Sequence, residues 1–229
     1  MKHELEHFHI GDSYGGNQDW FPTFMMRIGG CGAETACDSS IYFALHMGLT
    51  KIAPKNAPEL TKEDYIRFAY EMKPYLSPRS TGIDRTEIYI DGYMKYLHDR
   101  GETRLTMTSL NGDEPYEAAK EAVIRQIDDG CPIPTLVLDH RNKKLRDYVW
   151  HWFLLNGYDD SENAFTVKAV TYGGCEWLDL GELWDTGHER RGGFVLYHIK
   201  TEARSGEDTY VFDRKKRNES AAPLPTGRA

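Results

Sequence analysis

The sequence predicts an α+β fold, with helices in its first half and an antiparallel sheet in its second half. Two observations lead to this class. As far as Gly130, apolar residues recur at three- and four-residue spacing, as they do on the buried face of a helix. Beyond Gly130 the apolar residues form short runs, several of them alternating with polar residues, which is typical of strands packed on a core.

Helices are expected in four segments, each with apolar residues at helical spacing. Thr61 and Asp64 resemble a capping box, in which each side chain bonds to the backbone of the other at the start of a helix. Gly101 and Gly130 follow two of the segments and are typical helix stops. The expected helices cover residues 31–48, 61–76, 85–100 and 114–129.

Strands are expected after Gly130, and together they form the antiparallel sheet. One strand places His151, Phe153 and Leu155 on the same face, because side chains alternate along a strand. Residues 157–160 (Gly-Tyr-Asp-Asp) read as the turn that joins this strand to the next. The expected strands cover residues 132–139, 150–158, 163–171 and 192–200.

The size of the chain indicates one domain. Its 229 residues, 40% of them hydrophobic, are enough for a single substantial core. We place this domain at residues 1–204, and residues 205–229, which lack hydrophobic periodicity, as a loose C-terminal tail. No apolar run is long enough to span a membrane, and residues 1–10 do not resemble a secretory signal. A cytoplasmic location is therefore the expectation, and the oligomeric state is left open.

Charge and cysteine usage narrow the range of partners. A net charge of −8 argues against binding to nucleic acids or anionic membranes, and the basic cluster at 214–217 fits a solvated terminal segment. The cysteines are widely spaced and include no Cys-x-x-Cys pair, so we expect free thiols, no zinc site and no cofactor.

Cys31 is the best candidate for a nucleophile. It lies between Gly30 and Gly32 at the start of the first expected helix. Glycines allow a substrate backbone to approach closely, and a helix N-terminus stabilises a thiolate and so is expected to lower the pKa of the thiol. The alternative is a small buried side chain at a tight turn.

Two further residues complete a possible site. Among nine histidines, His151 alone begins an apolar strand between two tryptophans. In this position it can serve as the base for a thiol. The alternative is a histidine that only packs in the core. Gln18 precedes Cys31, and its amide can join the Cys31 N–H in binding an oxyanion, or it is an ordinary loop residue.

The order of these residues resembles the papain-like cysteine peptidases, in particular the branch of the bacteriocin-leader (double-glycine) peptidases. The motifs that match are Gln18, Gly-Cys-Gly at 30–32, and His151 followed by apolar residues and Gly-Tyr-Asp at 157–159. The resemblance covers about residues 17–200. It implies a papain-like fold, with an N-terminal helical part packed on the sheet, and a peptide or amide substrate.

The sequence departs from this family pattern at two places. Gln18 and Cys31 are thirteen positions apart, a longer gap than usual, and residues 20–29 in between are rich in aromatic residues that can wrap a substrate subsite. The family's orienting Asp or Asn falls near Thr171, which can accept a hydrogen bond but carries no charge. Asp159 and Asp139 remain open as substitutes.

The other cysteines have less favourable contexts for catalysis. Cys37 lies on the first helix and points away from Cys31, which fits core packing, and Cys131 opens a strand. Cys175 also follows two glycines, which makes it the alternative nucleophile, although no helix is expected to start there.

These observations together predict a cysteine hydrolase. In this hypothesis His151 takes the Cys31 proton, the sulfur attacks an amide carbonyl, and water releases the acyl group. Two alternatives stay open: an acyltransferase, transglutaminase-like enzyme or cell-wall amidase on the same scaffold, and a catalytically silent binding module that has lost the third member of its triad.

Overall fold

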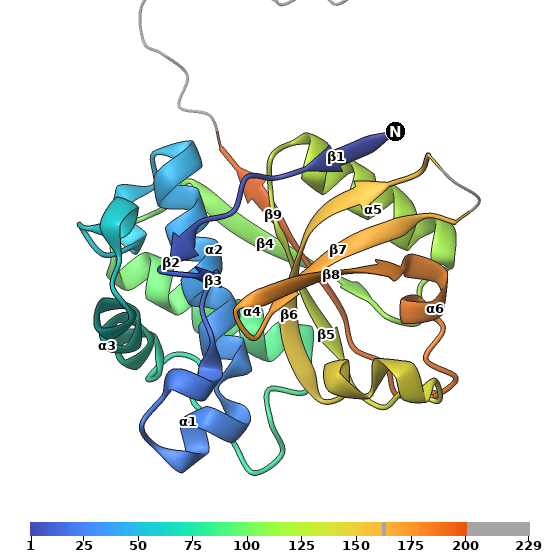
Figure 1. The fold of residues 1–229 in the computed structure, drawn as a ribbon, viewed down its shortest axis with the longest axis horizontal. Coiled ribbons are helices and arrows are strands. Elements are labelled where there is room, and N and C mark those ends of the chain that lie inside the picture. Colours follow the sequence, from blue (N-terminus) through green and yellow to red (C-terminus); the bar gives the residue numbers. More distant parts are fainter. Residues whose placement is uncertain (162–163, 201–229) are drawn as a thin grey trace, which may run out of the picture.

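A computed structural model describes residues 1–161 and 164–200 of the chain. Within this part, helices dominate the N-terminal half and an antiparallel sheet the C-terminal half, which confirms the predicted α+β class (Figure 1). The expected tail at 205–229 and the basic cluster at 214–217 lie outside the described residues. No helix of the described residues is both long and apolar enough to cross a bilayer.

All four expected helices are present, each a little shorter than its sequence pattern. They are α2 (Cys31–Met47), α3 (Lys62–Met72), α4 (Thr86–Asp99) and α5 (Tyr116–Asp128). The Thr61–Asp64 capping box at the start of α3 is formed as predicted. Two short helices and four 3₁₀ turns were not anticipated: α1 (Phe24–Gly29), α6 (Leu180–Trp184), η1 (Gln18–Trp20), η2 (Thr50–Ile52), η3 (Ala57–Glu59) and η4 (Lys143–Tyr148).

The main sheet has seven strands, and every pair in it is antiparallel. Their order is β4-β9-β5-β6-β7-β8, and β1 pairs with part of β6. Its strands are β1 (Lys2–Glu4), β4 (Leu105–Asn111), β5 (Ile133–Val137), β6 (His151–Asp159), β7 (Thr166–Thr171), β8 (Gly174–Asp179) and β9 (Gly193–Ile199). A separate small hairpin joins β2 (His9–Ile10) to β3 (Ser13–Tyr14).

The predicted turn at residues 157–160 is wrong. β6 continues to Asp159, and Gly157 pairs with Glu4 of β1. A Cβ atom on Gly157 would lie 3.0 Å from the His3 carbonyl oxygen, so this glycine lets β1 approach the sheet. The Gly-Tyr-Asp sequence therefore reflects close strand packing here, where the sequence alone suggested a reversal of the chain.

Helix α2 lies at the centre of the fold, and residues 31–43 are all buried. It packs against β6 on one side and α3 on another, with α1 and α3 left of the sheet and α5 and α6 to its right in Figure 1. Because the helix has no solvent face over this stretch, its polar residues need partners inside the protein. Ser40, for example, donates to the Ala36 carbonyl and bonds to the Tyr93 hydroxyl.

Asp38 is the main polar anchor of α2. Both of its carboxyl oxygens accept the Gly16 N–H at 3.2 Å, and one accepts the Tyr65 hydroxyl at 2.6 Å. These bonds fix the segment that leads into Gln18. Gly15 has a positive φ of 79°, and a Cβ atom there would lie 2.7 Å from both Asp38 and His7. Only glycine therefore fits at this position.

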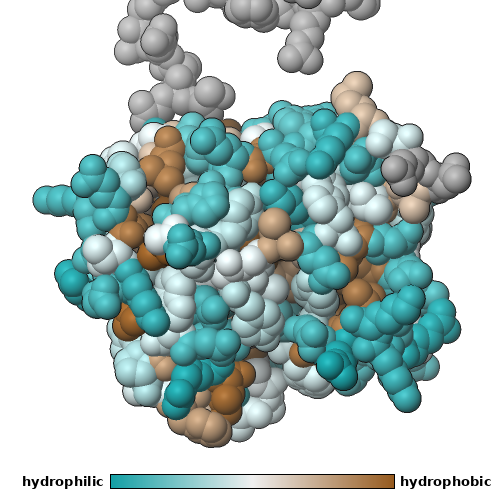
Figure 2. All heavy atoms as spheres, viewed as in Figure 1, coloured by the Kyte–Doolittle hydropathy of each residue, from teal (hydrophilic) through white to brown (hydrophobic). Residues whose placement is uncertain are grey.

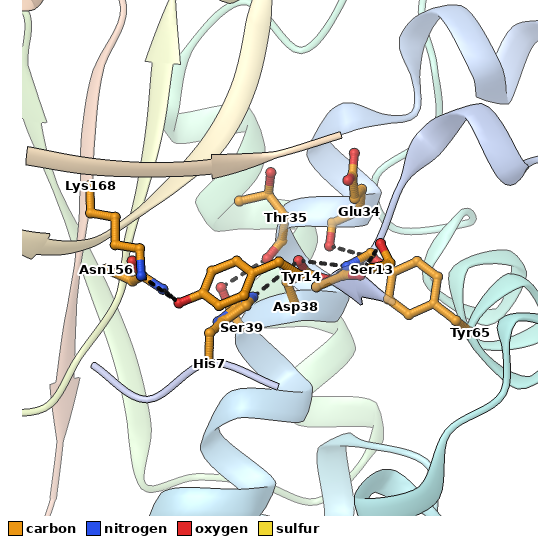
Figure 3. Close-up of polar contacts among 12 residues, drawn as sticks. His7, Ser13, Tyr14, Glu34, Thr35, Asp38, Ser39, Tyr65, Asn156 and Lys168 are labelled. Carbon is orange, nitrogen blue, oxygen red and sulfur yellow. Dashed lines mark hydrogen bonds and ion pairs between the residues drawn. The ribbon is translucent and has the colours of Figure 1, made fainter. Parts of the chain in front are cut away.

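A second group of polar contacts, partly buried, ties the N-terminal segment to the sheet. Lys168 on β7 donates to the Tyr14 hydroxyl at 2.8 Å and to Glu4 at 2.9 Å, and Asn156 on β6 also donates to Tyr14. Figure 3 shows Tyr14 between these two residues and the Asp38 group. The residues before Gln18 are thus held from both the sheet and α2.

Replacing Asp38 should test this anchor. Asp38→Ala leaves the Gly16 N–H without its acceptor and removes the shortest bond of the Tyr65 hydroxyl, so unfolding in urea should show a loss of at least about 2 kcal/mol. Tyr65→Phe removes one donor and keeps the carboxyl, and should cost about 1 kcal/mol. If the two variants were equally stable, the carboxyl would not be the anchor.

Candidate active site

Cys31 is the first residue of α2, and the glycine before it is required by packing. A Cβ atom on Gly30 would lie 2.3 Å from the backbone oxygen of Met26, which belongs to α1. A Cβ on Gly32 would meet the Ile83 side chain at 2.9 Å. The Gly-Cys-Gly sequence therefore lets α1 and the segment around Ile83 close tightly around the start of α2.

The Cys31 side chain is almost fully buried, with 8% of the residue exposed. Burial raises the pKa of its thiol to about 11, and the nearby Glu34 adds to this. Backbone N–H groups of Trp152, Gly32 and Cys31 itself act in the opposite direction but are outweighed. The sequence-based expectation of a lowered pKa is therefore wrong for this state, because loss of water exceeds the effect of the helix N-terminus.

His151 is the first residue of β6, next to the Trp152 N–H that faces the Cys31 thiol. Its Nε2 atom lies 2.6 Å from the Thr171 Oγ1 atom at the end of β7. Burial lowers the pKa of the imidazole to about 4. No hydrogen bond joins His151 to Cys31 in the part of the chain that the structure describes, and the pKa shifts of both groups favour their neutral forms.

Two strained residues flank the histidine and threonine. Trp150 directly precedes His151 with a φ of 53°, and Tyr172 directly follows Thr171 with a φ of 51°. Within residues 1–161 and 164–200 no other non-glycine residue has a positive φ. The Tyr172 ring lies parallel to the imidazole at 4.6 Å. Such backbone strain clusters at functional sites, and this signal is invisible in the sequence.

Gln18 lies in η1, where it is buried. Its Nε2 atom donates to the Arg27 carbonyl at 2.9 Å, and its Oε1 atom has no hydrogen-bond partner among the described residues. The long gap between Gln18 and Cys31 is filled by α1, which this bond holds against η1. The second N–H of the amide is not used by that bond.

Glu34 is a site residue that the sequence did not reveal. It lies one helical turn after Cys31, is buried, and its Oε2 atom has no hydrogen-bond partner among the described residues. Burial, followed by the charges of Asp38 and Asp19, holds the pKa of this carboxyl well above its usual range, while the Gln18 N–H acts against the rise. The same causes favour the protonated form of the Glu34 carboxyl. A glutamate on a helix usually indicates a solvated face. The burial of Glu34 beside Cys31 therefore becomes apparent only from the tertiary structure.

The remaining candidates lie apart from the imidazole. Asp159 is at the far end of β6 and accepts from Ser161, and Asp139 accepts from the Trp150 indole. Cys37 is buried on α2, and Cys175 is exposed on β8. Thr171 is therefore the one of the three proposed orienting residues that contacts His151.

A cavity of about 360 Å³ opens beside Cys31, between α1, residues 79–83 and Trp150. Cavities of this size bind small ligands or single side chains. The described residues contain no group of three or more His, Cys, Asp or Glu arranged to hold a metal ion.

Sequence comparisons do not assign this chain to a family. No protein-family model matches it, and no curated protein is significantly similar to it.

The ionisation of Cys31 can be measured directly. The difference in far-ultraviolet thiolate absorbance between wild type and Cys31→Ser should stay near zero at neutral pH and rise only towards pH 11. The other three thiols cancel in this difference. A thiolate signal already present near neutral pH would show that the site is an ion pair at rest.

His151 should make the fold sensitive to acid. The unfolded chain takes up this proton near pH 6.5 and the folded protein only near pH 4. As the pH falls through this window the unfolded state is favoured, by on the order of 3 kcal/mol at the lower end. His151→Gln should remove this share of the acid destabilisation in urea unfolding, whereas His188→Gln, at an exposed histidine, should retain it. Identical pH profiles for both variants would contradict the buried neutral imidazole.

Proposed function

We propose that this chain is a papain-like cysteine hydrolase that cleaves a peptide or other amide bond through an acyl-enzyme. One observation carries the proposal. The Cys31 thiol at the N-terminus of α2 faces backbone N–H groups, and the neighbouring residue on β6 is a histidine bonded to Thr171 at 2.6 Å. A thiol, a positioned base and oxyanion donors are the parts that acyl transfer needs.

The reaction starts from neutral groups. When the Thr171 oxygen accepts the Nε2–H of His151, the Nδ1 atom is left as the base. As the sulfur of Cys31 bonds to the carbonyl carbon, its proton moves to Nδ1. The tetrahedral intermediate then collapses, the C–N bond breaks, and His151 returns the proton to the leaving amine. Water, deprotonated by the same imidazole, hydrolyses the thioester and frees Cys31.

The oxyanion of the intermediate needs donors that are already in place. The N–H groups of Cys31, Gly32 and Trp152 face the thiol and are fixed by α2 and β6. Gln18 is a further proposed donor, through the N–H that it does not give to Arg27. Preorganised donors of this kind stabilise the developing charge without the cost of reorienting water.

Thr171 favours a second candidate function. It can orient the imidazole but cannot neutralise the imidazolium that forms during the reaction, as a carboxylate would. A chain that kept the cavity but only binds its ligand would tolerate this substitution. Water and an amine acceptor use the same acyl-enzyme, so an acyltransferase is distinguished by its products alone.

A peptide library read by mass spectrometry tests the hydrolase. Wild type should cleave a subset of the library, and Cys31→Ala and His151→Gln should lower cleavage by at least about 10²-fold. Cys175→Ala is the matched control and should cleave as wild type does. Cleavage that survives Cys31→Ala and fails in Cys175→Ala would move the nucleophile to Cys175, and binding without cleavage would support the silent module.

The Thr171 hydroxyl should matter for turnover. Thr171→Val keeps the shape of the side chain but removes the bond to His151, so kcat should fall roughly tenfold or more with little change in KM. Thr166→Val, on the same strand but away from the imidazole, should leave kcat unchanged. Equal kcat values for the two variants would remove Thr171 from the site.

A further inference from the structure

The cavity beside Cys31 has mostly apolar walls. Helix α1 contributes Met25 and Ile28, residues 79–83 contribute Ile83, and the sheet contributes Leu136 and Trp152. Trp150, directly before β6, completes the apolar part of the lining. The unexpected helix α1 thus turns the long gap between Gln18 and Cys31 into one wall of the cavity.

Three of the exposed large apolar side chains, Met25, Ile28 and Trp150, line this cavity. Apart from Met1, the large exposed hydrophobic residues of the described chain are Phe24, Met25 and Ile28 on α1, with Trp150 and Tyr172 beside the histidine. In Figure 2 brown side chains gather at the lower edge of the molecule, over α1. Exposed apolar surface concentrated at one place is typical of a binding site.

Trp150 is held in place as a wall of the cavity. Its indole N–H donates to Asp139 at 3.1 Å, and the Arg190 guanidinium lies 5.2 Å from the ring centre. Arg190 is itself paired with Asp84. An aromatic ring that is 45% exposed and still held by two partners, Asp139 and Arg190, is preorganised to pack against a ligand.

The charge of the lining selects against cations. Arg79 is the one charged residue among the residues that line the cavity, and no acid is present there. A cationic group on a substrate would lose water and meet mostly apolar surface, the Ser80 and Thr81 hydroxyls and another cation, with no negative charge to compensate.

The position of the cavity identifies which part of the substrate it holds. The leaving amine receives its proton from the imidazole, so it lies on the His151 side. The cavity is lined by Cys31 but not by His151. We propose that it binds the acyl part of the substrate, as a bulky, uncharged, apolar group attached to the carbonyl that Cys31 attacks. This inference rests on the proposed function.

Binding can be measured without catalysis. In Cys31→Ala, the indole N–H signals of Trp150 and Trp152 are followed by NMR during titration with simple amides. Hexanamide should bind at least about tenfold more tightly than acetamide, from the additional buried apolar surface. It should also bind about tenfold more tightly than 5-aminopentanamide, which has the same length and a terminal cation. Equal affinities for the three amides would overturn the proposal.

Matched variants locate the site of binding. In the same Cys31→Ala background, Ile28→Asp places a charge in the cavity wall and should reduce hexanamide affinity about tenfold. Phe24→Asp changes an exposed residue of the same helix outside the lining and should have little effect. Equal loss in both variants would place the ligand elsewhere and overturn the proposal.

Turnover then separates this inference from the proposed function. With wild type and aminomethylcoumarin amides, the hexanoyl compound should be hydrolysed at least about tenfold faster in kcat/KM than the acetyl compound. Hydrolysis without this preference overturns the acyl cavity and leaves the hydrolase intact. A binding preference without hydrolysis of either compound supports the cavity and counts against the hydrolase.

Discussion

The contact between the N-terminus of α2 and the start of β6 determines the rest of the site. Trp152 is fixed there by stacking on Tyr89 at 4.5 Å and by its indole bond to the Ile83 carbonyl at 2.6 Å. Its backbone N–H consequently faces the Cys31 thiol. Gly32 lets α2 pack closely against Ile83, since a Cβ atom there would lie 2.9 Å from the Ile83 side chain. Both side chains are also removed from water: Cys31 is 8% exposed and His151 is 3% exposed.

This loss of water explains why the site is built from neutral groups. Burial raises the pKa of Cys31 and lowers that of His151, so both effects oppose a thiolate–imidazolium pair. Burial also raises the pKa of the Glu34 carboxyl, which favours its neutral form. A neutral hydroxyl at Thr171 can orient a neutral imidazole, and in the proposed reaction backbone N–H groups would meet the charge that appears. In the proposed reaction the proton moves from Cys31 to His151 only when the substrate is attacked, so no thiolate–imidazolium pair exists beforehand.

Local signals in the sequence predicted the parts of the fold that depend on local structure. The four longer helices follow from hydrophobic spacing, a capping box and glycine stops. The pairing of β1 with β6 could not be predicted, because a three-residue edge strand has no periodicity of its own. For the same reason Gly157 was interpreted as a turn, when its missing side chain serves a neighbouring strand.

The candidate site likewise combines features that local sequence predicts with features that arise only from tertiary contacts. The order of Cys31, His151 and Thr171 follows from sequence context, and the structure places Thr171 against the imidazole. The direction of the Cys31 pKa could not be predicted, because the helix N-terminus is a local feature whereas burial comes from distant segments. The strained backbone at Trp150 and Tyr172 likewise exists only once β6 and β7 are paired.

The most direct test of the central claim is the protonation of the His151 ring, measured by ¹⁵N NMR in the free protein near neutral pH. We expect a neutral imidazole with its proton on Nε2, bonded to Thr171, and an unprotonated Nδ1 that is free to take the Cys31 proton. An imidazolium at neutral pH would contradict the neutral resting pair. A neutral ring with its proton on Nδ1 would show that His151 cannot act as the base in the orientation described.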